Sequence, residues 1–358
     1  MKHLYYILLI LFSFTQNVKA QDYLYQQSFD LINNMLEDKT PYSFKNAVFS
    51  VENAYLKGGL DSLTFNSKIE AYTNLAKLLV ENRTLEYQGK DKEAVSKYAS
   101  LFSVMKDSIP ILDAKGDEFT YLPFSYDFYD PFGHMDWSNM FVSKLLDTHK
   151  GNCHSLPYLY KILAEELGVE AHLALAPNHT YIKHRSERDG WYNTELTSGI
   201  FPIDAWLMAS GYIHIDAIRN GVYMKALDDK ESLALCLVDL AQAQLKEEFA
   251  DFDFVIKCAN KALEYYPNCV NAMILITESK GKQIELMLEA RNKDFTSVNQ
   301  YEDTRKIFLD IQDRLGAIHK LGYRQMPEEM YLDWLVSLKE EKEKYANKKI
   351  NTFNNTTD

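Results

Sequence analysis

The stretch from Lys150 to Gly168, KGNCHSLPYLYKILAEELG, constrains the fold most, because it predicts a helix with a defined start and end. Four leucines recur at three- and four-residue steps and share one buried face, namely Leu156, Leu159, Leu163 and Leu167. Pro157 is tolerated only in a first helical turn, so the helix begins within a residue or two of Cys153. Gly168 follows the last leucine and suits the left-handed conformation that ends a helix.

Cys153 therefore lies at the N-terminus of this helix. The free N–H groups and the positive end of the helix dipole favour a thiolate there, and the thiolate is the nucleophilic form of cysteine. A single cysteine is more often a buried core residue than a nucleophile. The position nevertheless makes Cys153 a candidate nucleophile, provided that a general base lies nearby.

A candidate base follows 26 residues later. Two β-prone runs flank the turn-rich segment 185–190, which predicts an antiparallel hairpin. If the hairpin is centred near Glu187, the numbers of facing residues sum to 374, and His179 faces Glu195 while Tyr181 faces Asn193. Facing side chains lie roughly 4.5–5.5 Å apart at Cβ, which lets Glu195 accept a hydrogen bond from one imidazole nitrogen. A slip of one residue would turn these side chains to the other face.

Three motifs together resemble the transglutaminase-like superfamily: Gly151-Asn-Cys153 opening a helix, Pro-Asn-His179, and Trp191-x-x-x-Glu195. The chain is similar in particular to a bacterial group in which this domain precedes tetratricopeptide-type helices. The similarity covers about residues 115–225, and more weakly the helices that follow.

The resemblance implies a catalytic triad. Cys153 would attack an amide or thioester, His179 would act as general acid–base, and Glu195 would orient His179. The superfamily usually has aspartate in the third position, so this chain departs from the pattern. Asn193 is an alternative orienting residue, because papain-type sites use asparagine.

Two asparagines are candidate auxiliary groups. Asn152 and Asn178 flank the nucleophile and the base, and each could donate to an oxyanion or form a turn. A zinc site formed by Cys153, His154 and His179 is disfavoured, because the chain has neither a Cys-x-x-Cys nor a His-Glu-x-x-His spacing. We therefore expect no metal and no cofactor.

The chain divides into five predicted segments. They are a signal peptide (1–20), an N-terminal helical region (21–112), a transglutaminase-like domain (113–230), a tetratricopeptide-like (TPR-like) helical region (231–346) and a disordered tail (347–358). Within residues 119–136, many aromatics are interrupted by proline and glycine. These rings either fix a loop to the core or form one wall of a cleft.

The N-terminal segment predicts export to the periplasm or the medium. Lys2 precedes an apolar run, and Val18-Lys-Ala20 places small residues at cleavage positions. No later segment is apolar enough to cross a bilayer. Removing residues 1–20 takes away Lys2 and Lys19, so the formal charge changes from −12 to −14. Phosphate backbones and anionic lipid surfaces would repel such a chain, which excludes nucleic acid as a partner.

The C-terminal helices offer a possible binding surface. Lys261 to Pro267 matches the closing part of one tetratricopeptide unit, and a second unit, 270–321, is less regular. They either bind a peptide or protein partner or extend the structure. Of the three further cysteines, Cys236 and Cys258 are expected in the core, with a Cys258–Cys269 or Cys236–Cys258 disulfide as the alternative.

The sequence thus predicts a mostly helical α+β fold with a papain/transglutaminase-like core, in which the nucleophile helix packs on a small antiparallel sheet. The predicted function is an exported cysteine enzyme that acts on amide or peptide bonds, with hydrolysis favoured over cross-linking. The alternative is a non-catalytic peptide- or partner-binding protein of the cell envelope. An intact Cys/His/acid set favours the enzyme.

Overall fold

The computed structural model describes residues 22–112 and 115–354, with side chains up to residue 344. The predicted signal peptide lies outside the described residues. The fold is a helix-rich α+β arrangement. The chain forms two compact units, each built from two separate segments: Met1–Ser62 with Asp229–Lys320, and Leu63–Asp228 with Leu321–Asp358. The predicted TPR-like segment 231–346 is therefore shared between the two units.

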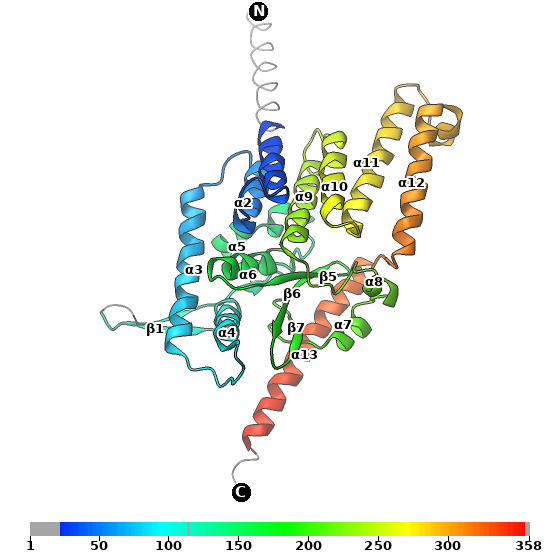
Figure 1. Ribbon diagram of the computed structural model, residues 1–358. Helices are drawn as coiled ribbons and strands as arrows, with labels where there is room; N and C mark the ends of the chain where they lie inside the picture. Colours follow the sequence, from blue (N-terminus) through cyan, green and yellow to red (C-terminus); the bar gives the residue numbers. More distant parts are fainter. Residues whose placement is uncertain (1–21, 113–114, 355–358) are drawn as a thin grey trace, which may run out of the picture. The chain divides into compact units, whose positions relative to one another are not determined.

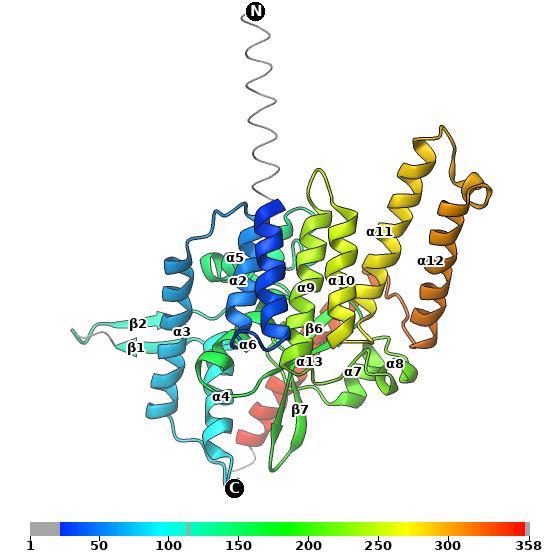
Figure 2. The ribbon, with the colours of Figure 1, turned by 45° about the horizontal axis from the view of Figure 1, so that its top comes forward.

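The first unit is helical throughout its described part. Residues 22–36 form its first helix. It continues with α2 (Phe44–Tyr55), α9 (Asp229–Leu245), α10 (Phe252–Tyr265), α11 (Val270–Glu289), the 3-10 helix η2 (Phe295–Gln300) and α12 (Glu302–Lys320). Helices α9 to α12 follow one another as a row of antiparallel neighbours (Figure 2). Asp251 starts α10 as a side-chain cap, because its carboxylate accepts the N–H of Phe254 at 3.0 Å.

Small buried residues let α9 and α10 pack closely. Cys258, Ala259 and Ala262 are fully buried on α10. Cys236 and Cys269 are also buried, and none of the three cysteines of this unit forms a disulfide. Burial raises the pKa of Cys258 and of Cys269, the latter to about 12, so these thiols remain protonated. They are core residues, which the first of the two readings predicted for Cys258.

The second unit combines helices with three small sheets. Its helices are α3 (Ser62–Asn82), α4 (Lys92–Lys106), η1 (Trp137–Met140), α5 (Val142–Thr148), α6 (Ser155–Glu166), α7 (Asp204–Ser210), α8 (Ile215–Arg219) and α13 (Glu328–Asn354). Its strands are β1 (Ile109–Leu112), β2 (Glu118–Tyr121), β3 (Ser125–Tyr126), β4 (Lys150–Gly151), β5 (His172–Ala176), β6 (His179–Ser186) and β7 (Gly190–Thr194).

The three sheets bring distant segments of this unit together. β1 and β2 form a projecting antiparallel hairpin (Figure 2). β3 pairs in parallel with β4, so Tyr126 lies opposite Gly151, two residues before Cys153. β5, β6 and β7 form an antiparallel sheet with β6 in the centre, and α13 lies beside it (Figure 1). This sheet and the start of α6 carry the predicted site residues.

The register of the β6–β7 hairpin differs from the prediction. Ile182 faces Thr194 and Lys183 faces Asn193, so the numbers of facing residues sum to 376 and the predicted sum of 374 is wrong. The reason is the turn, in which Ser186 pairs with Gly190 across residues 187–189, and Gly190 has a left-handed φ of +67°. The difference is two residues, so every side chain keeps its predicted face.

The C-terminal end of α6 agrees with the prediction from the sequence, whereas that of α13 differs. α6 ends at Glu166, and Gly168 has the left-handed φ of +64° expected of a helix stop. α13 continues to Asn354, although the sequence predicted an end near Ala346 and a disordered tail from residue 347. Lys339–Lys344 and the polar residues after it lack proline and glycine, so nothing in the sequence breaks the helix there. Residues 355–358 lie outside the described part.

Candidate active site

The start of α6 is fixed by side chains on both sides of Cys153. Asn152 Oδ1 accepts the N–H groups of His154 at 2.9 Å and Ser155 at 3.2 Å, so Asn152 caps the first turn. Its amide nitrogen donates to the carbonyl oxygen of Pro131 at 3.2 Å. His154 Nδ1 lies 2.8 Å from the carbonyl oxygen of Met140. The Asn152 amide is thus committed to the cap and to Pro131, which agrees with the turn-forming alternative.

Gly151 is required by a close approach of side chains. A Cβ at this position would collide with the hydroxyl of Ser155 and would lie 2.9 Å from Leu145 Cδ1. Ser155 cannot withdraw without loss, because its hydroxyl accepts the N–H of Asn152 at 3.0 Å. The glycine two residues before Cys153 is therefore explained by packing.

Gly151→Ala is expected to lower the free energy of unfolding by about 1–3 kcal/mol, the usual cost of overpacking a filled site. It should also slow the alkylation of Cys153, because relief of the clash moves Ser155 and the start of α6. Urea unfolding and the rate of iodoacetamide labelling measure the two effects. Gly281→Ala is the matched control, because a Cβ there meets no atom within 4 Å. Equal stability of Gly151→Ala and wild type would contradict the packing argument.

The three predicted catalytic residues meet in one buried cluster. His179 Nε2 donates to Glu195 Oε2 at 2.5 Å, and the two side chains are 0% and 1% exposed. His179 is also close enough to Cys153 to act on the pKa of the thiol. Since Nε2 is bound to Glu195, Nδ1 is the nitrogen that can exchange a proton with the sulfur, and in this structure Nδ1 lies 3.2 Å from the Tyr331 hydroxyl. The Cys153 thiol is further placed to donate to the carbonyl oxygen of Asn178 at 3.5 Å.

The charges of the cluster favour an ion pair between sulfur and imidazole. Burial opposes ionisation of Cys153, but the hydrogen bond and charge of His179 outweigh it and lower the pKa of the thiol. Burial likewise disfavours the imidazolium, but the charge of Glu195 and hydrogen bonds with Cys153 and Glu195 raise the pKa of His179 to about 10. These interactions favour the thiolate–imidazolium form over the neutral pair, with Glu195 as a carboxylate.

Glu195, and not Asn193, contacts His179. Burial opposes the charge of Glu195, but the positive charge of His179 and the N–H of Thr197, 2.7 Å from Oε1, lower its pKa. Asn193 instead donates to the carbonyl oxygen of Pro202 at 2.9 Å and to Asp204 at 2.7 Å. Glu195 reaches His179 diagonally, because Tyr181 is the residue that would face it in the observed register.

The remaining histidines do not extend the cluster. His172 Nδ1 lies 2.9 Å from the carbonyl oxygen of Leu227, and His184 is buried between the rings of Tyr98 and Tyr160. Burial lowers the pKa of His184 to about 3, so it is neutral. Among the described residues, no group of three or more His, Cys, Asp or Glu side chains is arranged to hold a metal ion.

Sequence reasoning missed the aromatic side chains that surround the sulfur. Tyr331 and Trp334 of α13 are 0% and 4% exposed. The Tyr331 hydroxyl lies 3.2 Å from His179 Nδ1 and 3.3 Å from the Tyr126 hydroxyl, and the charge of Cys153 acts on the pKa of both tyrosines. Burial raises the pKa of both tyrosines, so their hydroxyls stay protonated and can donate to the thiolate.

The rings of the aromatic segment 119–136 divide between the core, the surroundings of Tyr331 and the surface. Phe124 is buried in the core, whereas Tyr126 and Phe132 lie beside Tyr331. Phe128 and Tyr129 are exposed. Only the β3–β4 pairing, which no local sequence pattern indicated, explains why Tyr126 is the ring that reaches the sulfur.

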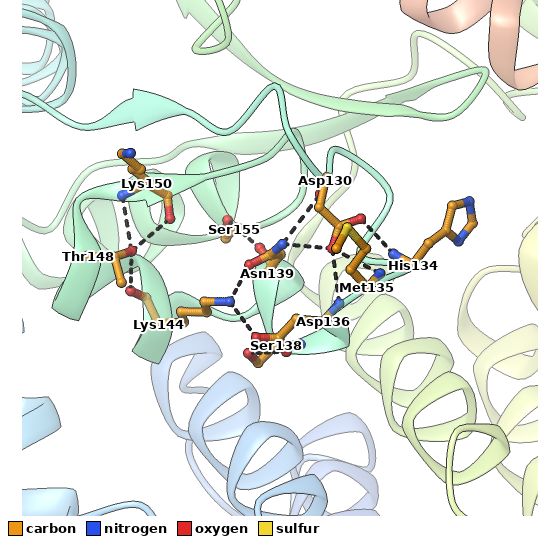
Figure 3. Close-up of polar contacts among 10 residues, drawn as sticks. All are labelled: Asp130, His134, Met135, Asp136, Ser138, Asn139, Lys144, Thr148, Lys150 and Ser155. Atoms are coloured by element: carbon orange, nitrogen blue, oxygen red, sulfur yellow. Dashed lines mark hydrogen bonds and ion pairs between the residues drawn. The ribbon is translucent and has the colours of Figure 1, made fainter.

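A buried carboxylate fixes the loop that leads to the nucleophile helix (Figure 3). Asp130 is 5% exposed and accepts four hydrogen bonds. The donors are the N–H groups of His134 (2.8 Å), Met135 (3.1 Å) and Asp136 (3.0 Å), and the amide of Asn139 (2.9 Å). The carbonyl oxygen of Asn139 in turn accepts the hydroxyl of Ser155 at 3.3 Å. Asp130 is thereby connected to the start of α6.

Comparison with known proteins gives little information on this chain. No family model and no curated protein matches it. Among solved structures, a match is menin, whose crystal structure reveals the binding site for Mixed Lineage Leukemia (MLL) protein. The match has a TM-score of 0.33 and 13% sequence identity, and covers 82% of this chain and 76% of menin. A similarity of this size carries no conclusion on fold or function.

None of the described helices combines the length and the apolar character that a transmembrane helix needs.

Proposed function

We propose that this protein is a transglutaminase-like cysteine enzyme that acts on amide or peptide bonds, with hydrolysis as the favoured outcome. The observation that carries the proposal is the hydrogen-bonded set of Cys153, His179 and Glu195 at the start of α6. A thiolate beside a carboxylate-bound imidazolium is an activated nucleophile with its general acid in place. Export, a papain-like core and a TPR-like binding region belong to the same proposal and rest on the sequence motifs.

In the first half of the reaction, the Cys153 thiolate attacks the amide carbonyl carbon and a C–S bond forms. The carbonyl oxygen becomes an oxyanion, for which the N–H of Cys153 and the hydroxyl of Tyr126 are nearby donors. His179 Nδ1 then gives its proton to the amide nitrogen, the C–N bond breaks, and the amine leaves. Glu195 stabilises the imidazolium and keeps Nδ1 directed at the reacting atoms.

In the second half, water attacks the thioester carbonyl while neutral His179 takes a proton from the water. The C–S bond breaks, the carboxylic acid leaves, and the thiolate–imidazolium pair forms again. An amine in place of water would give a new amide, which is cross-linking. Hydrolysis is favoured because water is present at far higher concentration than a lysine acceptor.

Cys153→Ala is expected to abolish labelling by iodoacetamide at pH 6.5 and turnover of fluorogenic peptide amides, while the fold remains. The other cysteines are buried, and burial raises the pKa of Cys258 and Cys269, so they should not react. Mass spectrometry locates the label. Cys236→Ala, a buried position in the other unit, should label like wild type. Labelling of Cys153→Ala at the wild-type rate would refute the proposal.

One observation favours the alternative, a non-catalytic peptide- or partner-binding protein. Cys153 is 8% exposed, and Tyr331 and Trp334 pack against its partner His179. A site of this kind needs a movement before a substrate can enter. The two functions are separated by turnover of the unlabelled protein, because a binding protein would give no product from peptide amides even if its Cys153 reacts readily with iodoacetamide.

A further inference from the structure

The space beside the catalytic sulfur is filled by side chains of α13. The Tyr331 hydroxyl lies 3.2 Å from His179 Nδ1. The ring of Trp334 contacts the edge of the His179 ring, with centroids 4.7 Å apart and planes at 72°. All of these residues belong to the same compact unit.

The walls around Tyr331 suit an aromatic ring with a polar end. The ring of Phe132 lies 5.2 Å from that of Tyr331, and the ring of Trp334 lies 5.7 Å away, both tilted. These distances are within the range of favourable aromatic pairs. At the polar end, the Tyr126 hydroxyl and His179 Nδ1 can both bond to a phenol oxygen.

The segment that leads into α13 makes a contact of the kind that a bound peptide makes. The side-chain amide of Asn178 donates to the backbone carbonyl oxygen of Met326 at 2.9 Å. Asn178 has a left-handed φ of 54° in the turn before His179, so its amide is held beside the general base. A backbone carbonyl and an aromatic side chain of the same segment thus lie on either side of the catalytic histidine.

Attack requires the substrate carbonyl carbon within about 3–3.5 Å of the sulfur. The Tyr331 hydroxyl already lies 3.2 Å from His179 Nδ1, the nitrogen that must face the sulfur and the scissile amide, so a substrate and Tyr331 exclude each other. We infer that Tyr331 and Trp334 occupy a substrate subsite, and that this subsite binds an aromatic side chain next to the scissile amide. The inference rests on the proposed function and names its substrate class, namely peptides with tyrosine-like residues.

Tyr331→Ala tests the inference through the access of small molecules to Cys153. We expect iodoacetamide to label Cys153 at least 10-fold faster at pH 7 in this variant than in wild type. We also expect p-cresol to occupy the vacated space and return the rate toward that of wild type, while cyclohexanemethanol, which is of similar size, does not. Tyr331→Phe keeps the ring and should label within about 3-fold of wild type, since the ring alone still blocks access.

Val336→Ala is the matched control, because Val336 lies on the same helix and is 57% exposed. It should label like wild type. Equal labelling of Tyr331→Ala and wild type would overturn the inference, and so would equal protection by p-cresol and cyclohexanemethanol. Failure of the proposed function looks different, because Cys153 would then label in every variant without product from any peptide amide.

Substrate preference gives a second test that needs no folded Tyr331→Ala variant. Wild type and Tyr331→Phe should turn over fluorogenic amides of tyrosine-containing peptides at least 10-fold faster, in kcat/KM, than matched leucine peptides. A preference for leucine, or no preference, would overturn the aromatic subsite while leaving the cysteine mechanism intact.

Discussion

Glu195→Gln is expected to slow the alkylation of Cys153 at pH 7 by roughly 30-fold or more, because a thiol with an ordinary pKa near 8.5 is only a few per cent thiolate at that pH. In wild type His179 lowers the pKa of Cys153 and so favours the thiolate, and the charge of Glu195 maintains the imidazolium. Glutamine keeps the shape but removes that charge. Amide turnover should fall by about 10²–10⁴-fold, the usual contribution of a general acid–base.

The pH profile of alkylation shows in which direction the charge of Glu195 shifts the pKa of Cys153. In wild type the rate should fall only when acid protonates Cys153, below the ordinary range of thiol pKa values, and the ion pair should persist until His179 loses its proton near pH 10. In Glu195→Gln the acid limb should move to higher pH. Glu170→Gln is the control, because the side chain of Glu170 is 88% exposed. A profile that is the same in Glu195→Gln and wild type would show that Glu195 does not tune the pair.

Local patterns in the sequence predicted the two parts of the site that form from residues close together in the chain, namely α6 and the β6–β7 hairpin. The leucine period, Pro157 and Gly168 located α6 to within two residues of its observed start and end. The β-prone runs predicted the β6–β7 hairpin and the faces of its side chains. The predicted register was wrong, because the centre of the turn is set by the left-handed Gly190 and not by the midpoint of the polar segment. His179 and Glu195 still meet, since a two-residue shift preserves the face.

Long-range packing was not predictable in this way. Tyr331 follows Cys153 by 178 positions, and its helix shows only that one face is apolar, not which surface that face covers. Tyr126 reaches the sulfur through a two-residue parallel pairing that leaves no period in the sequence. One signal was available for α13: Tyr331, Trp334, Leu335 and Leu338 recur at three- and four-residue steps before a charged run, which indicates a docking face.

The role of Asp130 was also not predictable from the sequence. Three of its four hydrogen-bond donors are backbone N–H groups, which every residue except proline has, so no residue pattern indicates them. Its carboxylate gathers N–H groups from successive residues 134–136, and the Asn139 amide completes the set. None of these donors has a second partner of comparable strength to replace it. The loop therefore depends on one side chain, and with it the position of Ser155 and the first turn of α6.

Asp130→Ala is accordingly expected to lower the free energy of unfolding by about 4 kcal/mol, because four hydrogen bonds to a buried, charged acceptor are lost at about 1–2 kcal/mol each, less what the loop recovers by relaxing. Asp136→Ala is the matched control. This neighbouring aspartate is 55% exposed at its side chain, and it caps η1 through the N–H of Ser138, so its loss should cost only about 1 kcal/mol.

Urea unfolding followed by tryptophan fluorescence suits both variants, because all four tryptophans belong to the unit that contains Asp130. In urea-free buffer, folded Asp130→Ala should also label Cys153 more slowly than Asp136→Ala does, since the start of α6 loses its support through Asn139 and Ser155. Equal losses of stability in the two variants would mean that the buried hydrogen bonds of Asp130 contribute no more than an exposed cap. The loop would then be held by its apolar contacts, and Asp130 would have no part in placing the nucleophile.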